Sequence, residues 1–199
     1  MKPSEHAADP FVRRARAEGW RSRAVFKLEE IDRRERLLRP GQICIDLGAA
    51  PGAWSQYVRG KVGARGRVIA ADLLDIEPIP GVELVQGDFR EEAVLEALVA
   101  RLPQGGADVV LSDMAPSLSG IDAIDQPRSM HLAELALELA ERVLKGEGAT
   151  LIKVFQGAGF QELVRAARQR FAQVKLIKPG ASRARSPELY LLAKQRVLV

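Results

Sequence analysis

Short apolar runs alternate with longer amphipathic stretches along this chain of 199 residues, and few folds accommodate that order. The apolar runs are rich in branched residues and are predicted to be strands over residues 42–46, 67–72, 82–86, 108–113, 149–155, 172–177 and 188–193. Helical spacing of apolar residues predicts helices over residues 91–102, 129–144 and 157–170. Strands that are apolar along their whole length need cover on both faces. We therefore expect an α/β chain with a mostly parallel seven-stranded sheet and helices on both faces.

The chain shows no internal repeat, low-complexity tract or linker that would divide it into two globular parts. We predict a basic N-terminal extension over residues 1–40 and a single globular unit over residues 41–199. The extension holds 11 Lys and Arg against 7 Asp and Glu, and residues 165–199 hold 9 against 1, whereas the stretch between them is acidic. Basic ends around an acidic middle indicate a surface that attracts phosphates beside a pocket that does not. Solvated helix faces would give the same counts, so charge alone leaves both interpretations open.

Composition argues against several classes of protein. The chain is 47% hydrophobic and 28% charged, as in ordinary globular proteins, which argues against disorder and fibres. No apolar run approaches the roughly 20 residues of a bilayer-spanning helix, and residues 1–10 lack the apolar stretch of a secretory signal. The single cysteine, Cys44, lies in an apolar run, so we expect a core thiol and no disulfide framework or zinc cluster. We expect a cytoplasmic monomer with no metal and no membrane association.

Residues 45–55 combine the end of a strand, a tight loop of small residues and the start of a helix. Gly48 and Gly52 allow the backbone to approach a ligand, and the free amides of the next helix can face its polar groups. Nicotinamide-binding proteins use the same geometry, but the spacing here is not G-x-G-x-x-G. Asp46 closes the strand, where a carboxylate disfavours a pyrophosphate and suits the cationic methionine end of S-adenosyl-L-methionine.

Two more carboxylates follow the next two predicted strands. Asp72 ends the second strand, where it can accept hydrogen bonds from both hydroxyls of a ribose. Asp88 follows the third strand and is placed to accept from an adenine amino group. Each carboxylate alone could be a helix cap or a turn former, but three at successive strand ends favour a cofactor site. Trp54 either covers the core face of the first helix or contacts the cofactor, and the sequence leaves both open.

Lys153 interrupts the otherwise apolar strand at residues 151–155. A buried charge is costly unless it has partners, although a lysine can also protect a sheet edge. Methylation of a weakly acidic hydroxyl, such as a ribose 2′-hydroxyl, needs a group that orients the hydroxyl and accepts its proton. A lysine can do this when it is partly neutral, a state that desolvation and neighbouring cations favour.

Three other ionisable residues have suitable positions for a network with Lys153. Asp113 ends a strand before a proline-containing turn, Glu188 opens the last strand, and Lys27 lies in the basic extension. We predict that Lys27 favours the neutral form of Lys153 while the carboxylates orient both ammonium groups. Spacing alone does not assemble these four residues.

Six motifs occur in order along nearly the whole chain: Arg21-Ser22-Arg23-Ala24, residues 46–52, Asp88-Phe89-Arg90, residues 112–116, Lys153-Val154-Phe155 and residues 182–188. On these motifs the chain resembles the FtsJ (RrmJ) family of heat-shock ribosomal RNA 2′-O-methyltransferases. The resemblance implies a Rossmann-like methyltransferase fold that uses S-adenosyl-L-methionine. The implied substrate is a uridine ribose of 23S ribosomal RNA within the assembled 50S subunit, with no metal in the reaction.

The family's functional residues can be carried over position by position. Its Lys-Asp-Lys-Glu tetrad falls on Lys27, Asp113, Lys153 and Glu188, with Lys153 as the proton acceptor. Its cofactor contacts fall on Gly52, Trp54, Asp72, Asp88 and Asp113. The chain departs from the usual bacterial pattern at Ala53, where a second glycine is common, and at Ser117, where asparagine is common. Neither departure removes a member of the tetrad.

Arginines near both ends of the chain are candidate phosphate contacts: Arg13, Arg14, Arg16, Arg21, Arg23, Arg183 and Arg185. Aromatic residues make up only 5% of the chain, which favours recognition of RNA by shape and backbone over a base-stacking platform.

Other functions remain open at this point. A Rossmann oxidoreductase would share the glycine-rich turn, and a non-catalytic ribosome-assembly factor would share the RNA-binding surface. A ribose methyltransferase acting on transfer RNA or a messenger cap would share the chemistry as well. The intact set of four ionisable residues argues against the non-catalytic alternative.

Overall fold

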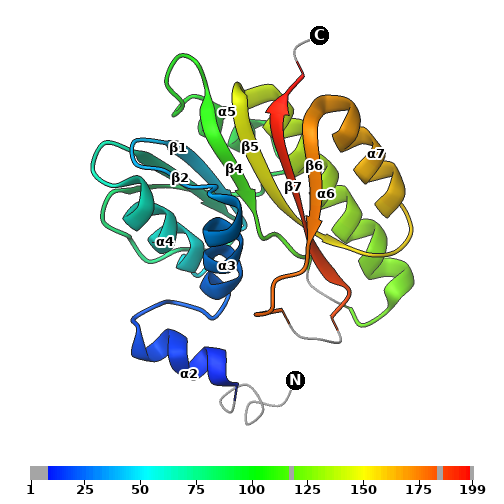
Figure 1. Cartoon of the computed structure of the whole chain (residues 1–199), viewed down its shortest axis with the longest axis horizontal. Coiled ribbons are helices and arrows are strands. Elements are labelled where there is room, and N and C mark those ends of the chain that lie inside the picture. The colour runs from blue at the N-terminus through cyan, green and yellow to red at the C-terminus, as the bar shows by residue number, and fades with distance from the viewer. Residues whose placement is uncertain (1–8, 117–118, 183–185, 198–199) are drawn as a thin grey trace.

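The computed structural model describes residues 9–116, 119–182 and 186–197. One sheet of seven strands forms its centre, in the order β3-β2-β1-β4-β5-β7-β6. The strands are β1 (Ile43–Leu47), β2 (Arg67–Asp72), β3 (Val82–Gln86), β4 (Ala107–Ser112), β5 (Leu144–Phe155), β6 (Phe171–Ile177) and β7 (Glu188–Arg196). The helices are α2 (Pro10–Ala17), α3 (Val25–Glu35), α4 (Ala53–Val62), α5 (Glu92–Val99), α6 (Asp122–Val143) and α7 (Phe160–Arg170). Figure 1 shows these elements as helical layers around the sheet.

The predicted fold class is confirmed. The strands on one side of the sheet pair in parallel from β3 through β5, and β7 pairs antiparallel with both β5 and β6. All seven predicted strands are present, but β5 begins at Leu144 rather than at residue 149. Its first residues pair with β4 across a register shift. This stretch is polar and contains glycine, so it lacks the apolar pattern that predicts a strand. Helix α6 begins at residue 122 rather than 129 and continues through Pro127.

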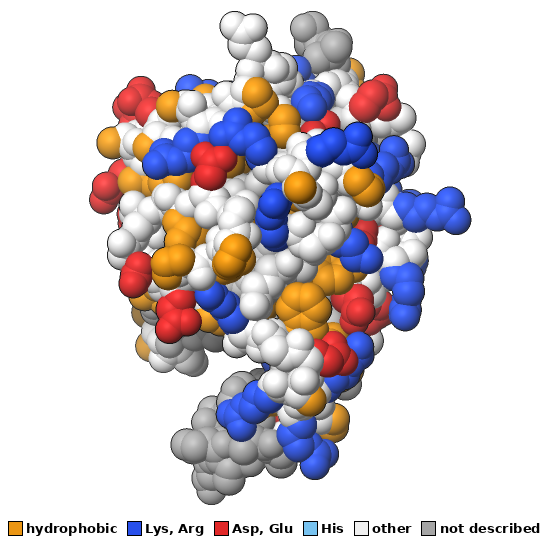
Figure 2. Space-filling view, turned by 90° about the vertical axis from the view of Figure 1, so that its left-hand side faces the viewer, with side chains coloured by type: hydrophobic (Ala, Val, Ile, Leu, Met, Phe, Trp, Pro, Cys, Tyr) orange, Lys and Arg blue, Asp and Glu red, His pale blue; other side chains and the backbone are white. Residues whose placement is uncertain are grey.

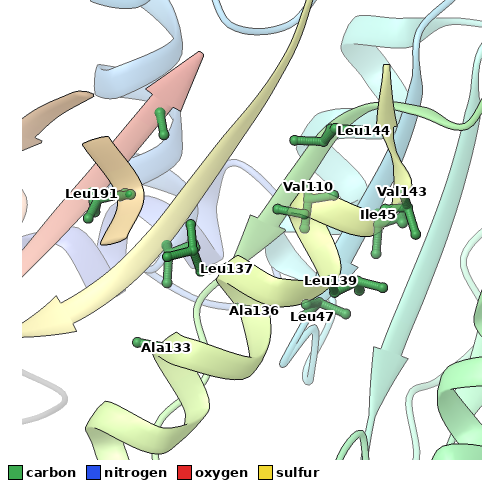
Figure 3. Packing of buried hydrophobic residues seen from close by; sticks show 14 of the residues in the cluster. Ile45, Leu47, Val110, Ala133, Ala136, Leu137, Leu139, Val143, Leu144 and Leu191 are labelled. Atoms are coloured by element: carbon green, nitrogen blue, oxygen red, sulfur yellow. The ribbon is translucent and has the colours of Figure 1, made fainter. Parts of the chain in front are cut away.

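Alternate residues of the central strands point into two separate hydrophobic cores. Ile45 and Val110 face the helices α5, α6 and α7, whereas Cys44 and Val109 face α3 and α4. Figure 3 shows Leu137 of α6 lying over the first of these faces. Because both faces are covered, the strands can be apolar along their whole length, as the sequence pattern requires. Burial raises the pKa of the Cys44 thiol, so the expected core thiol is confirmed.

The N-terminal segment contains two helices that the hydrophobic pattern did not predict. Helix α2 starts at Pro10, and Asp9 caps it by accepting a hydrogen bond of 2.9 Å from the Phe11 amide. It projects below the body of the molecule in Figure 1, and the ring of Phe11 packs 5.7 Å from that of Phe26 in α3. Helix α3 is part of the second core, because Val25, Phe26, Leu28 and Ile31 are buried there. Among the described residues, no helix is both long enough and apolar enough to cross a membrane.

The carboxyl ends of β1 to β5 lie at one edge of the sheet, because these strands are all parallel. Strand order reverses between β1 and β4, so the loops that follow these two strands run in opposite directions. Ligands of open α/β sheets bind at such a point. Asp46, Asp72, Asp113 and Lys153 all lie near this edge.

Replacing Leu137 by alanine tests how far the first core stabilises the fold. Leu137 is 1% exposed and packs against the sheet, so the substitution leaves a cavity and should lower the free energy of unfolding by about 2–5 kcal/mol. Urea unfolding followed by circular dichroism measures the change. The matched control is Glu134→Ala on the exposed face of α6, which should change stability by no more than about 0.5 kcal/mol. Equal effects of the two substitutions would contradict this account of the core.

Candidate active site

Asp113 and Lys153 lie side by side because their strands are parallel neighbours. Ser112 of β4 pairs with Ile152 of β5, so the next residues of the two strands come together beyond this pair. The Lys153 ammonium lies 3.2 Å from Oδ1 of Asp113 and donates to the Asp113 backbone carbonyl at 2.5 Å. The two side chains are only 9% and 17% exposed. The ammonium therefore has the partners that a buried charge requires.

The other two predicted residues form a second ion pair on the same side of the sheet. Nζ of Lys27, on α3, lies 2.7 Å from Oε1 and 2.9 Å from Oε2 of Glu188. Glu188 opens β7 and pairs with Phe155, two residues beyond Lys153 on the neighbouring strand. The structure thus brings together four side chains that spacing alone did not assemble, with one lysine and one carboxylate in each pair.

Tyr190 lies between the two ion pairs, and the sequence analysis did not single it out. It pairs with Lys153 across β5 and β7, and its hydroxyl donates a hydrogen bond of 2.7 Å to Oδ1 of Asp113. The ammonium of Lys27 lies 5.8 Å from the centre of its ring. The period of two along a strand was the available signal, because Glu188 and Tyr190 must share one face of β7.

The ion pairs act on the titration of the groups around them. Burial raises the pKa of Glu188, but three effects outweigh it: the charge of Lys27, hydrogen bonds from Lys27 and Ser182, and the charge of Lys153. Together they hold the pKa of Glu188 below its ordinary value of 4.5. Burial and the charges of Asp113 and Glu188 raise the pKa of Tyr190 well above its usual range. At neutral pH, Glu188 is therefore an anion and Tyr190 a neutral donor.

A cavity of about 620 Å³ lies at the carboxyl ends of the strands, next to Asp113. Its walls come from the loops after β1 to β4 and from α6, and the residues that line it include Gly48, Ala50, Asp72, Leu74, Asp88, Asp113, Met114, Arg128 and His131. Gly48 has φ +71°, and an added Cβ would lie 2.9 Å from the Met114 backbone. A glycine at this position therefore lets the loop after β1 lie against the loop after β4. Asp113 connects this cavity to the two ion pairs.

Asp46 is fully buried, is not among the residues that line the cavity, and has an unsatisfied oxygen. Its Oδ2 accepts a hydrogen bond of 2.6 Å from the Ser55 hydroxyl, and its Oδ1 has no partner among the described residues. Burial raises the pKa of this carboxyl to about 7, and the charges of Asp113 and Asp72 act in the same direction, whereas the Ser55 hydrogen bond opposes the shift. A cationic group nearby would favour the ionised form and satisfy the free oxygen.

Asp72 and Asp88, two of the predicted cofactor contacts, both line the cavity, and their contact with a cofactor stays a prediction. Asp72 accepts hydrogen bonds from the amides of Ala50 and Leu74 at 2.9 and 2.8 Å, which fixes its carboxylate at the end of β2. Asp88 accepts from the guanidinium of Arg90 at 2.6 Å, and this pairing lowers the pKa of Asp88 to about 2. Each carboxylate oxygen has two lone pairs, so Asp72, which accepts one hydrogen bond at each oxygen, keeps capacity for a ligand's hydroxyl groups. Both oxygens of Asp88 already accept from the amide and guanidinium of Arg90, so a ligand's amino group would have to displace part of this contact.

Gly52 and Trp54 are not among the residues that line the cavity. Gly52 precedes α4 with φ 107°, and Ala53 is buried directly after it. Trp54 is buried, donates a hydrogen bond of 2.8 Å to the carbonyl of Ala24, and packs 5.8 Å from the ring of Tyr190. Trp54 therefore has a packing role, and the cofactor contacts of Gly52 and Trp54 stay predictions.

The candidate phosphate contacts lie in different surroundings. Arg13, Arg14 and Arg16 lie on α2, and Figure 2 shows Lys and Arg side chains gathered at the lower end of the molecule, where this helix projects. Arg23 is partly buried and donates to Asp9 and to the Ala181 carbonyl. Arg21 donates to backbone carbonyls near the cavity. Arg183, Arg185 and Ser117 lie outside the described residues.

The fold and the site together define a class of protein. A Rossmann-like sheet carries buried pairs of lysine and carboxylate next to a cavity at the strand ends. The model of the FtsJ-like methyltransferase family matches residues 20–196, and the chain belongs to this family.

Curated relatives match almost the whole chain. A ribosomal RNA large subunit methyltransferase E from Xanthomonas campestris pv. campestris (strain B100) is 57% identical over 190 residues, which are 96% of this chain and 90% of the relative. A protein of the same name from Stenotrophomonas maltophilia (strain K279a) is 58% identical over the same shares.

Solved structures agree with the fold. A crystal structure described as that of a ribosomal RNA methyltransferase from Plasmodium falciparum superposes with a TM-score of 0.79 at 27% identity. The match covers 89% of this chain and 98% of that one. A structure described as an rRNA-methylase from Clostridium thermocellum matches with a TM-score of 0.58 at 16% identity, and it supports the fold alone.

The lowered pKa of Glu188 predicts how its ion pair with Lys27 depends on pH. The folded-state pKa lies below the unfolded value, so the ionised carboxylate contributes stability that is fully present above the unfolded value near 4.5. This contribution is lost as the pH falls through the folded-state pKa. Urea unfolding of the protein and of Glu188→Gln should show a difference in stability at pH about 7 that shrinks below pH about 4.5. A difference that stays constant over this range would show that Glu188 does not act through its charge.

Proposed function

We propose that the chain transfers a methyl group from S-adenosyl-L-methionine to the 2′-hydroxyl of a uridine ribose in 23S ribosomal RNA, within the assembled 50S subunit. The observation that carries this proposal is the buried pair of Lys153 and Asp113 at the edge of the cavity. A methyltransferase acting on a hydroxyl needs a base next to its methyl donor, and this pair supplies an amine held at a fixed position. The proposal also implies a cytoplasmic protein, and we expect it to act as a monomer.

The residues around the cavity fit S-adenosyl-L-methionine. The volume of about 620 Å³ lies in the usual range of small-molecule pockets, about 300–1,000 Å³. Asp46 keeps a buried, unsatisfied carboxylate oxygen, which suits the cationic methionine end. Asp72 would hold the ribose hydroxyls and Asp88 the adenine amino group. When bound, the cofactor supplies an activated methyl group on a sulfonium centre.

The ion pairs would position the acceptor and take its proton. Lys153 in its neutral form accepts the proton of the ribose 2′-hydroxyl while the oxygen gains its methyl group. Asp113 holds the amine of Lys153, and Tyr190 in turn holds the Asp113 carboxylate. Glu188 orients the ammonium of Lys27 through their ion pair. The enzyme thus contributes positioning and electrostatics.

Three observations support RNA as the substrate. Relatives more than 50% identical are named ribosomal RNA large subunit methyltransferases. Arginines on the projecting helix α2 offer sequence-independent contacts to phosphates. The ribose 2′-hydroxyl, which the proposed chemistry modifies, is also the group that distinguishes RNA from DNA.

Methylation of the proposed substrate can be tested with purified components. The protein is incubated with labelled S-adenosyl-L-methionine and either 50S subunits or free 23S ribosomal RNA, both from cells that lack this modification. We expect label on a single uridine, alkali-resistant as a 2′-O-methyl ribose, and more of it on 50S subunits than on free RNA. Label on a base, or transfer to transfer RNA instead, would contradict the assignment.

Replacing Lys153 by alanine tests the role of the proton acceptor. We expect the rate of transfer to fall by at least about 100-fold, because general-base catalysis contributes about 10²–10⁴-fold. Binding of S-adenosylhomocysteine, measured by calorimetry, should change by less than about threefold, because Lys153 is not among the residues that line the cavity. The matched control is Lys175→Ala on β6, an exposed lysine paired with Glu35. Substantial turnover by the Lys153 variant would exclude the assigned role.

A further inference from the structure

The guanidinium of Arg21 donates hydrogen bonds to two separate loops. Its Nη1 donates to the carbonyl of Pro51 at 3.1 Å and to that of Glu77 at 2.6 Å, and its Nη2 donates to the carbonyl of Pro78 at 3.0 Å. Pro51 belongs to the loop between β1 and α4, whereas Glu77 and Pro78 belong to the loop between β2 and β3. One side chain from the N-terminal segment therefore ties together the loops that follow β1 and β2.

Both loops that Arg21 joins contribute residues to the walls of the cavity. Gly48 and Ala50 line it from the first loop, and Leu73 and Leu74 line it from the second. A Cβ at Gly52 would lie 3.0 Å from Nη1 of Arg21, so the guanidinium lies directly against the glycine turn. The carbonyls that Arg21 binds therefore belong to the same two loops as these walls.

Further hydrogen bonds fix the segment from which Arg21 extends. The Arg21 amide donates to Oε1 of Gln56 at 3.0 Å, and Trp54 donates to the carbonyl of Ala24. Both Gln56 and Trp54 lie on α4, the helix that follows the glycine turn. The N-terminal segment therefore contacts both the glycine turn, through the guanidinium of Arg21, and the helix that follows the turn, through Gln56 and Trp54.

The guanidinium group suits this task, and its engagement argues against a direct phosphate contact. Arginine presents five N–H donors in a rigid plane, so it can serve three carbonyls at once, whereas a lysine is a single flexible point charge. Hydrogen bonds with a charged donor are about twice as strong as neutral ones. A phosphate at Arg21 would have to displace these carbonyl contacts, unlike one at Arg13 or Arg16, which are exposed on α2.

We infer that Arg21 is a positioning residue for the cofactor site: it holds the loops after β1 and β2 in the conformation that binds S-adenosyl-L-methionine, and it links the basic N-terminal segment to that site. This inference rests on the proposed function, because it takes the cavity to be the cofactor site. It also revises the expectation that Arg21 contacts RNA phosphates.

Two substitutions separate the positioning role from a phosphate contact. Arg21→Met removes the donors and the charge, and Arg21→Lys keeps the charge but cannot reach three carbonyls. Affinity for S-adenosylhomocysteine is measured by calorimetry, and affinity for 50S subunits is measured at several salt concentrations. The matched control is Arg65→Met, which removes an exposed arginine charge from the turn between α4 and β2.

We expect both Arg21 variants to bind S-adenosylhomocysteine about tenfold more weakly, which corresponds to about 1.4 kcal/mol, while Arg65→Met binds it normally. The salt dependence of 50S binding should be unchanged for Arg21→Lys. Hydrogen exchange without ligand should be faster in residues 48–52 and 72–79 of both Arg21 variants. This last measurement reports on the loops themselves and does not depend on cofactor binding.

Three results would overturn the inference. Normal affinity for S-adenosylhomocysteine in Arg21→Met, with a salt slope for 50S binding reduced by about one, would make Arg21 a phosphate contact. A lower melting temperature with normal affinity and normal loop exchange would make its role a general structural one. Full affinity in Arg21→Lys would show that charge alone suffices. Failure of the unmodified protein to bind S-adenosylhomocysteine would instead refute the proposed function. Hydrogen exchange in the two loops would still test whether Arg21 holds them in place.

Discussion

A buried lysine inside a parallel sheet must find an anion, and the rest of the site follows from how this chain meets that requirement. The ammonium of Lys153 is almost fully removed from water, and Asp113 is the carboxylate nearest to it. An unpaired charge in this position would cost several kcal/mol, so the pair constrains the ends of both strands. Since Asp113 also lines the cavity, the same contact that compensates the charge connects the amine to the ligand site.

The antiparallel strand β7 completes this arrangement. Because it runs opposite to β5, its first residues, and not its last, lie at the edge where the parallel strands end. Tyr190 therefore reaches Asp113 from the C-terminal part of the chain, and Glu188 lies close enough for the charge of Lys153 to lower its pKa. Lys27 reaches Glu188 across 161 positions of sequence, because α3 packs its buried side chains against the same face of the sheet. Lys27, Glu188 and Tyr190 reach the site because apolar residues of α3 and β7 pack in the core, although those apolar residues take no part in the chemistry.

The N-terminal segment serves the site through more than its charge. Its helix α3 supplies Lys27 and core residues, and Arg21 donates to the carbonyls of two cavity loops. Arg13 and Arg16 are exposed on α2, whereas the guanidiniums of Arg14, Arg21 and Arg23 already have acceptors within the protein. Similar residues in a similar basic stretch thus have different partners, and the local fold decides which are free to meet a substrate.

The sequence by itself determined the strands, the class of fold and the kinds of residue at the strand ends, because apolar periodicity and glycine turns depend on nearest neighbours along the chain. The positions of Asp72, Asp113 and Lys153 could therefore be predicted, and family resemblance added Lys27 and Glu188. Only the tertiary structure decided the place of Tyr190, the packing of Trp54 and the partners of Arg21. These contacts come from strand pairing and helix docking between distant segments. Every residue has a backbone carbonyl, so the sequence carries no signal of which carbonyl will accept a hydrogen bond.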